Sequence, residues 1–203
     1  MPLHLYHCTR ARSMRPLWTL EEMGLEYELT VMPFPPRYLY KSYLEVNPLG
    51  TVPALVDGEI TMTESAGICQ YLVDAYGPTD LAVGRDEADY AAYLNWLHRC
   101  DATLTFPQTL VLRYTRLEPE ETRNPQVAAD YRKWFAHRFR SVERALENRT
   151  YLCSERFTIA DVCVLYCLVL ASSLDIDEVF TPNVKRWWDL VTQRPAYRKT
   201  FEI

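Results

Sequence analysis

Residues 47–55 of the chain read Asn47-Pro48-Leu49-Gly50-Thr51-Val52-Pro53-Ala54-Leu55. Pro53 enters a short apolar strand here, although a proline removes one hydrogen-bond donor from a strand. A cis peptide bond between Val52 and Pro53 is one way to make this position useful, because it turns the backbone polar groups of Val52 outward. The segment therefore predicts a stretch of extended backbone with which a peptide can pair.

Ten residues after Pro53, Thr63-Glu64-Ser65 opens an amphipathic helix. The first N–H groups of a helix have no partner within the helix, so a helix N-terminus attracts an anion. A carboxylate can therefore be held beside the extended backbone of Val52. Together the two segments predict a binding site for a small anionic peptide.

The composition is that of an ordinary globular protein. Of 203 residues, 48% are hydrophobic and 24% are charged, and the formal net charge is −5. An acidic chain without blocks of Lys or Arg argues against a nucleic-acid partner, and the longest apolar run, 162–171, is too short to span a membrane. The first residues show no signal peptide, so we expect a cytoplasmic protein with reduced thiols.

The first 76 residues follow strand and helix patterns in the order strand-helix-strand, a short helix, then strand-strand-helix. Asp57-Gly58 is a strong turn dipeptide and joins the last two strands as a hairpin. The expected strands cover residues 3–7, 26–32, 53–56 and 59–61, and the expected helices cover residues 13–23, 38–46 and 63–76.

From residue 87 onward the pattern is helical throughout. The expected helices cover residues 86–115, 125–147, 158–173 and 184–193, and a last one begins at Pro195. Pro107 lies inside the first of these and is expected to kink or break it. The turn-rich residues 78–85 are the best linker candidate, so we predict two domains, residues 1–77 and residues 86–203.

Four motifs in the right order give the chain a family resemblance that covers essentially its whole length. They are Leu20–Glu28, residues 47–55, Thr63–Ile68 and Phe157–Asp161. The chain resembles the cytosolic glutathione S-transferase superfamily. The resemblance implies an α/β thioredoxin-like N-terminal domain (βαβ, a short helix, then ββα), an all-α C-terminal helical bundle, and a homodimer.

The same resemblance implies where glutathione binds. Val52 and Pro53 would pair with its cysteinyl backbone, Glu64 would hold the γ-glutamyl ammonium and Ser65 the γ-glutamyl carboxylate. The glycyl carboxylate needs a cation or a donor from the short helix at 38–46. The candidates there are Tyr40 and Lys41, with Tyr38 and Arg37 as open alternatives.

Such enzymes need a donor near the start of the first helix to stabilise the glutathione thiolate. A thiol with a pKa of about 8.5 is mostly protonated at neutral pH. The candidates, in order, are Ser13, Thr9, Arg12 and Cys8. Ser13 is also placed to cap the helix with its side chain.

This chain departs from the family at the catalytic position, because family members often have a serine near Arg10 or Ala11. Arg12 or Arg15 can compensate by placing a positive charge beside the sulfur. Cys8 can instead form a mixed disulfide with glutathione, but no resolving cysteine stands at Ala11, which argues against a dithiol cycle.

Three functions follow from the resemblance. The first is a glutathione transferase that activates the thiolate for attack on a hydrophobic electrophile. The second keeps the site but acts as a glutathione-dependent thiol-transferase, peroxidase or isomerase, and Cys8 is the residue that tests it. The third is a non-catalytic, glutathione-binding interaction protein.

The electrophile is expected between the two domains, against the helix predicted at 86–115. The candidate lining residues are Trp96, Cys100, Phe106 and Tyr114. No group of Cys, His and acidic residues has the spacing of a metal site, so we expect glutathione as co-substrate and no metal.

Thr158-Ile159-Ala160-Asp161 is the pattern of a capping box, with Asp in the position that Glu more often takes. It precedes an almost fully apolar helix that must be buried. We therefore expect a folding role for Asp161, in which its replacement by Ala costs about 1–2 kcal/mol and leaves the substrate preference intact.

Overall fold

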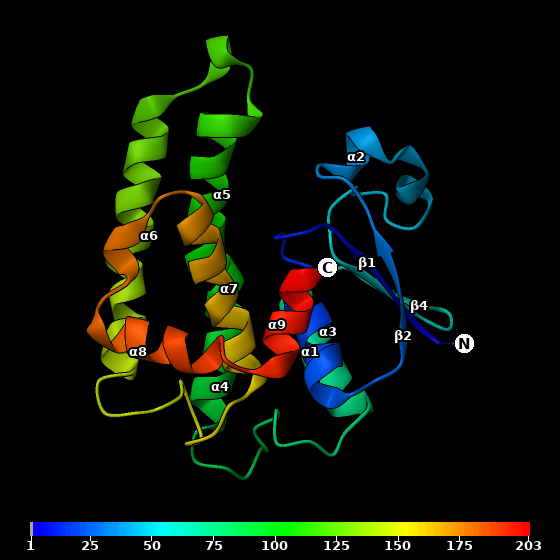
Figure 1. Cartoon of the computed structure of the whole chain (residues 1–203), viewed down its shortest axis with the longest axis vertical. Helices are drawn as coiled ribbons and strands as arrows, with labels where there is room; N and C mark the ends of the chain where they lie inside the picture. Colours follow the sequence, from blue (N-terminus) through cyan, green and yellow to red (C-terminus); the bar gives the residue numbers. More distant parts are fainter. Residues whose placement is uncertain (1) are drawn as a thin grey trace. The chain divides into compact units, whose positions relative to one another are not determined.

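The computed structural model describes residues 2–203. It divides into two compact units, shown with their elements in Figure 1. The first unit runs to Ala82 and takes in Val191–Ile203, and the second is Val83–Leu190.

The first unit is built on a four-stranded mixed sheet with the strand order β2-β1-β3-β4. β1 runs parallel to β2 and antiparallel to β3, and β3 and β4 form the predicted hairpin. The strands are β1 Leu3–His7, β2 Tyr27–Val31, β3 Ala54–Asp57 and β4 Ile60–Met62. This confirms the predicted thioredoxin-like arrangement.

Helices α1 (Met14–Met23) and α3 (Ser65–Ala75) belong to the hydrophobic core of this unit. Leu5 of β1 is completely buried and packs with Leu17 of α1 and Ile68 of α3. Alternation along a strand sends neighbouring side chains to opposite faces. The residue after Leu5 accordingly belongs to a second cluster around Tyr43, Val52 and Ala54.

The short helix predicted at 38–46 is in fact two pieces. They are α2 Pro36–Leu39 and the 3-10 helix η1 Lys41–Glu45. Tyr40 separates them with φ −141° and ψ 70°, which is outside the helical region. The break lets Tyr43 point into the core cluster while Tyr40 and Lys41 stay exposed.

The last helix, α9 (Pro195–Glu202), packs against α1 and belongs to the first unit. Arg194, just before it, donates two hydrogen bonds of 2.7 Å to the Glu22 carboxylate, and the rings of Trp18 and Tyr197 are 4.9 Å apart. The predicted second domain of residues 86–203 therefore differs from the structure, which places residues 191–203 with the first unit.

The second unit is helical, and no strand is found in its described residues. In Figure 1, α5 and α6 run side by side. Its elements are α4 Tyr90–Arg99, η2 Cys100–Thr105, α5 Phe106–Leu112, η3 Arg113–Leu117, η4 Glu120–Thr122, α6 Pro125–Ala145, α7 Ile159–Ser173, η5 Asp177–Val179 and α8 Pro182–Val191. Among residues 2–203, no helix has the length and apolar character needed to cross a membrane.

The helix predicted at 86–115 is not one uniform α-helix. It begins at Tyr90, and the π-helical stretches η2 and η3 flank the α-helical stretch that contains Pro107. Proline has no N–H to donate and its ring clashes with the carbonyl group four residues earlier. The predicted break is therefore a change from α-helical to π-helical hydrogen bonding just before Pro107.

The start of α7 carries the predicted capping box, which the structure confirms. The Asp161 carboxylate is completely buried and accepts hydrogen bonds from the backbone N–H of Thr158 at 3.0 Å and of Leu152 at 3.1 Å. It also accepts one from the Trp187 indole Nε1 at 3.0 Å. Burial raises the pKa of this carboxyl to about 6, and its hydrogen bonds oppose that rise.

Replacing Asp161 by Ala is expected to lower the free energy of unfolding by about 3 kcal/mol or more, because donors beyond the cap lose their acceptor. Asp161→Asn keeps one carbonyl acceptor and should lose less. Denaturant midpoints of the two variants measure this order, and equal losses would contradict it.

His7, at the end of β1, is a buried imidazole with 1% exposure. Burial lowers its pKa to about 4, and the Ser13 backbone opposes that shift. Unfolded chains bind a proton on this residue below about pH 6.5, whereas the folded chain does not until about pH 4. The unfolded state therefore binds more protons in this interval, so stability falls as the pH is lowered through it.

The variant His7→Gln is expected to flatten this pH dependence between about pH 6.5 and pH 4. In the wild type, His7 contributes a slope of up to about 1.4 kcal/mol per pH unit within the interval. Urea unfolding at several pH values measures the slope. A His7→Gln slope equal to that of the wild type would show that His7 does not carry it.

Candidate functional site

The turn that precedes Pro53 is fixed by two buried side chains. The Val52–Pro53 peptide bond is cis, as predicted. Asn47 Nδ2 donates to the Thr51 carbonyl oxygen at 2.7 Å, and the Tyr43 hydroxyl donates to the same oxygen at 2.6 Å. The turn therefore delivers Val52 in a defined position at the start of β3.

Neither Asn47 nor Tyr43 is among the site residues predicted from the sequence. Asn47 is only 2% exposed and its Oδ1 accepts from the Leu49 N–H at 3.1 Å. An Asn that bonds its own backbone two residues on is a turn signal. The Asn-Pro pair at the start of residues 47–55 could therefore have been used to predict that Asn47 stabilises a turn.

Gly50 allows α2 to approach this turn closely. Its φ is +61°, and a Cβ atom there would lie 2.5 Å from the Cβ atom of Arg37. Only glycine fits both the left-handed backbone and this contact. Tyr40 and Lys41 follow α2 directly and are exposed, so either side chain is available to a ligand.

The N-terminus of α3 has the features that hold an anion. Glu64 occupies the N-cap position in extended conformation and is exposed, and among the described residues no side chain caps this helix. Ser65 is the first helical residue and is 3% exposed. The N–H groups of the first turn are therefore not taken up by an N-cap side chain.

Arg15, considered above as a cation for the sulfur, lies instead beside Ser65. Its side chain is completely buried, and Nη1 donates to the Ser65 hydroxyl oxygen at 2.9 Å. This bond joins α1 to the first turn of α3.

Two of the catalytic candidates, Cys8 and Ser13, are turned inward. The Ser13 hydroxyl accepts from the Cys8 N–H at 3.1 Å and donates to the Cys8 carbonyl oxygen at 3.2 Å. The predicted side-chain cap by Ser13 is therefore wrong, because the hydroxyl bonds the loop and not the helix. Cys8 is completely buried, and burial raises its pKa to about 11.

The other two candidates lie on the accessible side of the same loop. Thr9 is exposed and Arg12 is half-buried. Between them Arg10 has φ 57°, a left-handed conformation that is uncommon for a side chain of this size. Because Tyr6 pairs with Ala54 across β1 and β3, the loop after β1 begins beside the segment that contains Pro53.

Of the four electrophile candidates in the second unit, two are buried and two are at least partly exposed. Trp96 and Cys100 are buried in its interior. Phe106 is 52% exposed, and Tyr114 is half-buried with the Arg113 guanidinium 5.7 Å from the centre of its ring. Of these four candidates, Phe106 and Tyr114 are therefore the two whose side chains are accessible.

The cysteines form no disulfide within the described residues, and all six are buried. The same residues contain no group of three His, Cys, Asp or Glu side chains arranged to hold a metal ion.

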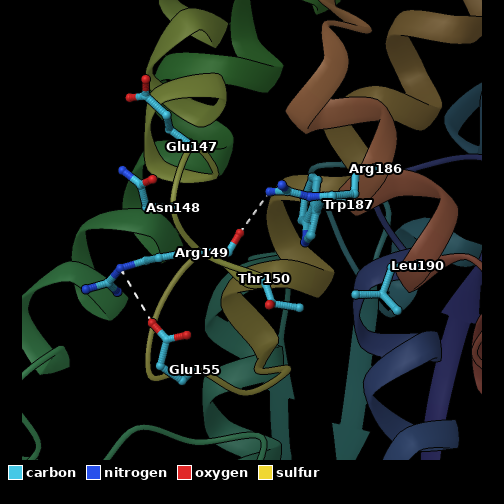
Figure 2. A pocket seen from close by; sticks show the side chains of 8 residues that line it. All are labelled: Glu147, Asn148, Arg149, Thr150, Glu155, Arg186, Trp187 and Leu190. Atoms are coloured by element: carbon cyan, nitrogen blue, oxygen red, sulfur yellow. Dashed lines mark hydrogen bonds and ion pairs between the residues drawn. The ribbon is translucent and has the colours of Figure 1, made fainter.

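A cavity of about 320 Å³ lies within the second unit, and Figure 2 shows its walls. It is lined by Glu147, Asn148, Arg149, Thr150, Glu155, Arg186, Trp187 and Leu190. Arg149 is paired with Asp89 at 2.6 Å and with Glu155 at 3.8 Å, and Arg186 donates to the Arg149 carbonyl oxygen at 3.0 Å. Its arginines are thus bonded to the protein, and none of the predicted site residues lies in it.

Two family models match the chain. "Glutathione S-transferase, N-terminal domain" matches residues 10–75 and "Glutathione S-transferase, C-terminal domain" matches residues 107–195. Among curated relatives, Glutathione S-transferase 3 of Schizosaccharomyces pombe is 28% identical over 96% of this chain and 84% of its own length.

Solved structures give the same result. The glutathione transferase URE2P6 from Phanerochaete chrysosporium, in complex with oxidized glutathione, has a TM-score of 0.86 and 27% identity, over 99% of this chain and 95% of its own. Ure2p5 from the same organism, cocrystallized with 1-(S-glutathionyl)-2,4-dinitrobenzene, has a TM-score of 0.84 and 25% identity, over 99% and 93%.

The order of the strands, the cis bond before Pro53, the uncapped start of α3 and the two matching domain models agree with one another. The chain belongs to the cytosolic glutathione S-transferase superfamily.

Proposed function

We propose that this protein binds glutathione in its first unit and joins it, through its sulfur, to a hydrophobic electrophile. The observation that carries the proposal is the pair of Val52, held in a fixed turn before a cis proline, and Ser65 at the start of α3. The complex of URE2P6 with oxidized glutathione supports a glutathione site in this fold.

In the proposed complex the cysteinyl backbone of glutathione pairs with Val52. The γ-glutamyl carboxylate accepts hydrogen bonds from Ser65 and the N–H groups of α3, where the helix dipole favours a negative charge. The exposed Glu64 carboxylate holds the γ-glutamyl ammonium. Tyr40 or Lys41 holds the glycyl carboxylate.

The sulfur lies next to Pro53 in this arrangement, and the loop after β1 faces it. The thiol of glutathione loses its proton to solvent, the Thr9 hydroxyl donates a hydrogen bond to the resulting thiolate, and Arg12 adds a positive charge. Both effects lower the pKa of the bound thiol and raise the fraction of thiolate at neutral pH. The thiolate then attacks the electrophile, forming a C–S bond as the leaving group departs with its electron pair.

The buried state of Cys8 favours this chemistry over thiol transfer. A mixed disulfide requires an accessible thiolate, whereas Cys8 is completely buried with a pKa raised to about 11. We therefore rank conjugation above the thiol-transferase alternative.

Phe106 and Tyr114 are our candidates for contact with the electrophile, because they are the accessible members of the predicted set. The Ure2p5 complex with a glutathionyl dinitrobenzene makes a dinitrohalobenzene a suitable test substrate. The homodimer implied by the family resemblance stays a prediction.

The variant Thr9→Val is expected to raise the pKa of bound glutathione, because it removes the hydroxyl and keeps the volume. Each unit of pKa lowers the thiolate fraction at neutral pH about tenfold, and conjugation should recover at alkaline pH. The ultraviolet absorbance of the bound thiolate, followed against pH, measures the shift.

Cys8→Ala serves as the control, since its side chain is completely buried. The thiol of glutathione bound to this variant should titrate as in the wild type. A Thr9→Val titration that matches the wild type would remove Thr9 from the mechanism. A loss of disulfide-exchange activity in Cys8→Ala alone would favour the thiol-transferase alternative.

Asn47→Ala is expected to weaken glutathione binding about tenfold, because the turn before Val52 loses its buried donor and acceptor, and to lower stability by about 1–3 kcal/mol. Calorimetric titration with glutathione measures the first effect and thermal unfolding the second. Asn148→Ala, an exposed Asn of the second unit, is the matched control. If Asn47→Ala lowers stability but leaves glutathione affinity unchanged, the turn has no part in binding.

A further inference from the structure

The Arg15 side chain is a completely buried guanidinium. Burying a charge is costly unless hydrogen bonds and opposite charge offset the loss of water. Arg15 belongs to the first turn of α1, and Nη1 reaches across to the Ser65 hydroxyl on α3 at 2.9 Å. A charged side chain is thus held against the start of α3.

The start of α3 already carries positive character. The N–H groups at a helix N-terminus amount to about half a positive charge. A guanidinium placed there adds to that field and does not cancel it. An anion bound at this end of α3 interacts favourably with both, so the buried arginine strengthens the preference for a negative ligand.

The hydrogen bond also sets the role of the Ser65 hydroxyl. A hydroxyl group has one donor and two acceptor positions. The oxygen of Ser65 accepts from Arg15, so its own hydrogen is the group left to donate. A donor whose oxygen accepts from a charged group is polarised and donates more strongly.

We propose that Arg15 is a positioning residue for the γ-glutamyl carboxylate of glutathione. It holds the Ser65 hydroxyl as a hydrogen-bond donor and adds positive charge beneath the first turn of α3. This inference rests on the proposed function, because it concerns the same ligand. It moves the role of Arg15 from the sulfur, where the sequence placed it, to the opposite end of glutathione.

A purely structural role for Arg15 makes a different prediction. If the guanidinium only joins α1 to α3, its removal lowers stability and weakens all ligands of the site by the same factor. If Arg15 acts on the carboxylate, its removal weakens only ligands that carry that group. Comparison of two ligands therefore separates the roles even when a variant is less stable.

The experiment uses calorimetric titration of the full chain with glutathione and with γ-aminobutyryl-cysteinyl-glycine. This analogue lacks only the carboxylate of the γ-glutamyl residue. The wild type should bind glutathione at least about tenfold more tightly than the analogue, as a charge-assisted hydrogen bond predicts. In Arg15→Met this ratio of dissociation constants should fall several-fold, and the preference that is left comes from the N–H groups at the start of α3.

The matched control is Arg194→Met. It also removes an arginine of the first unit that bonds another element, here Glu22 of α1. Its ratio should equal that of the wild type. Arg15→Lys keeps the charge but loses the planar fork, so its ratio should lie between those of the wild type and Arg15→Met.

A wild-type ratio that persists in Arg15→Met overturns the inference and leaves the proposed function standing. Failure of the wild type to bind glutathione overturns the proposed function itself. Equal wild-type binding of both ligands overturns the carboxylate role alone. If Arg15→Met does not fold, Arg15→Lys decides, because a ratio identical to that of the wild type contradicts the proposed geometry.

Discussion

The antiparallel pairing of β1 with β3 is the constraint on which the rest of the first unit depends. It brings the C-terminal end of one strand beside the N-terminal end of the other, with Tyr6 opposite Ala54. The loop that begins at Cys8 and the turn that ends at Pro53 are therefore neighbours, although more than forty residues separate them. A one-residue slip in this register would exchange the faces of the strand and separate the two segments from their present partners.

Buried polar side chains hold the loops that this pairing brings together. Asn47 bonds the turn before Pro53, Ser13 bonds the loop after β1, and Arg15 bonds the start of α3. Each of these groups needs its partners, since an unsatisfied polar group in the interior is costly. The surface offered to a ligand is thereby carried by segments whose conformation is fixed from within.

The sequence predicted the elements and failed at particular side chains. Alternation and turn residues gave the strands, and the motif around Val52–Pro53 gave the cis bond. The pattern could not show that Ser13 faces Cys8, because a serine just before a helix is, from the sequence alone, most simply interpreted as an N-cap. It also could not place Arg15, since that guanidinium bonds Ser65, fifty residues away.

Helix α9 is the other element whose place local patterns could not give. Its amphipathic pattern fits any apolar neighbour, and the structure shows α1 in that position through Glu22 and Trp18. The first unit is therefore assembled from two segments that the whole second unit separates in the sequence. During synthesis, α1 leaves the ribosome long before α9 has been made. The side of α1 that packs against α9 therefore stays uncovered while the whole second unit is synthesised. Native packing around α1 is thus completed only after the whole second unit has been translated.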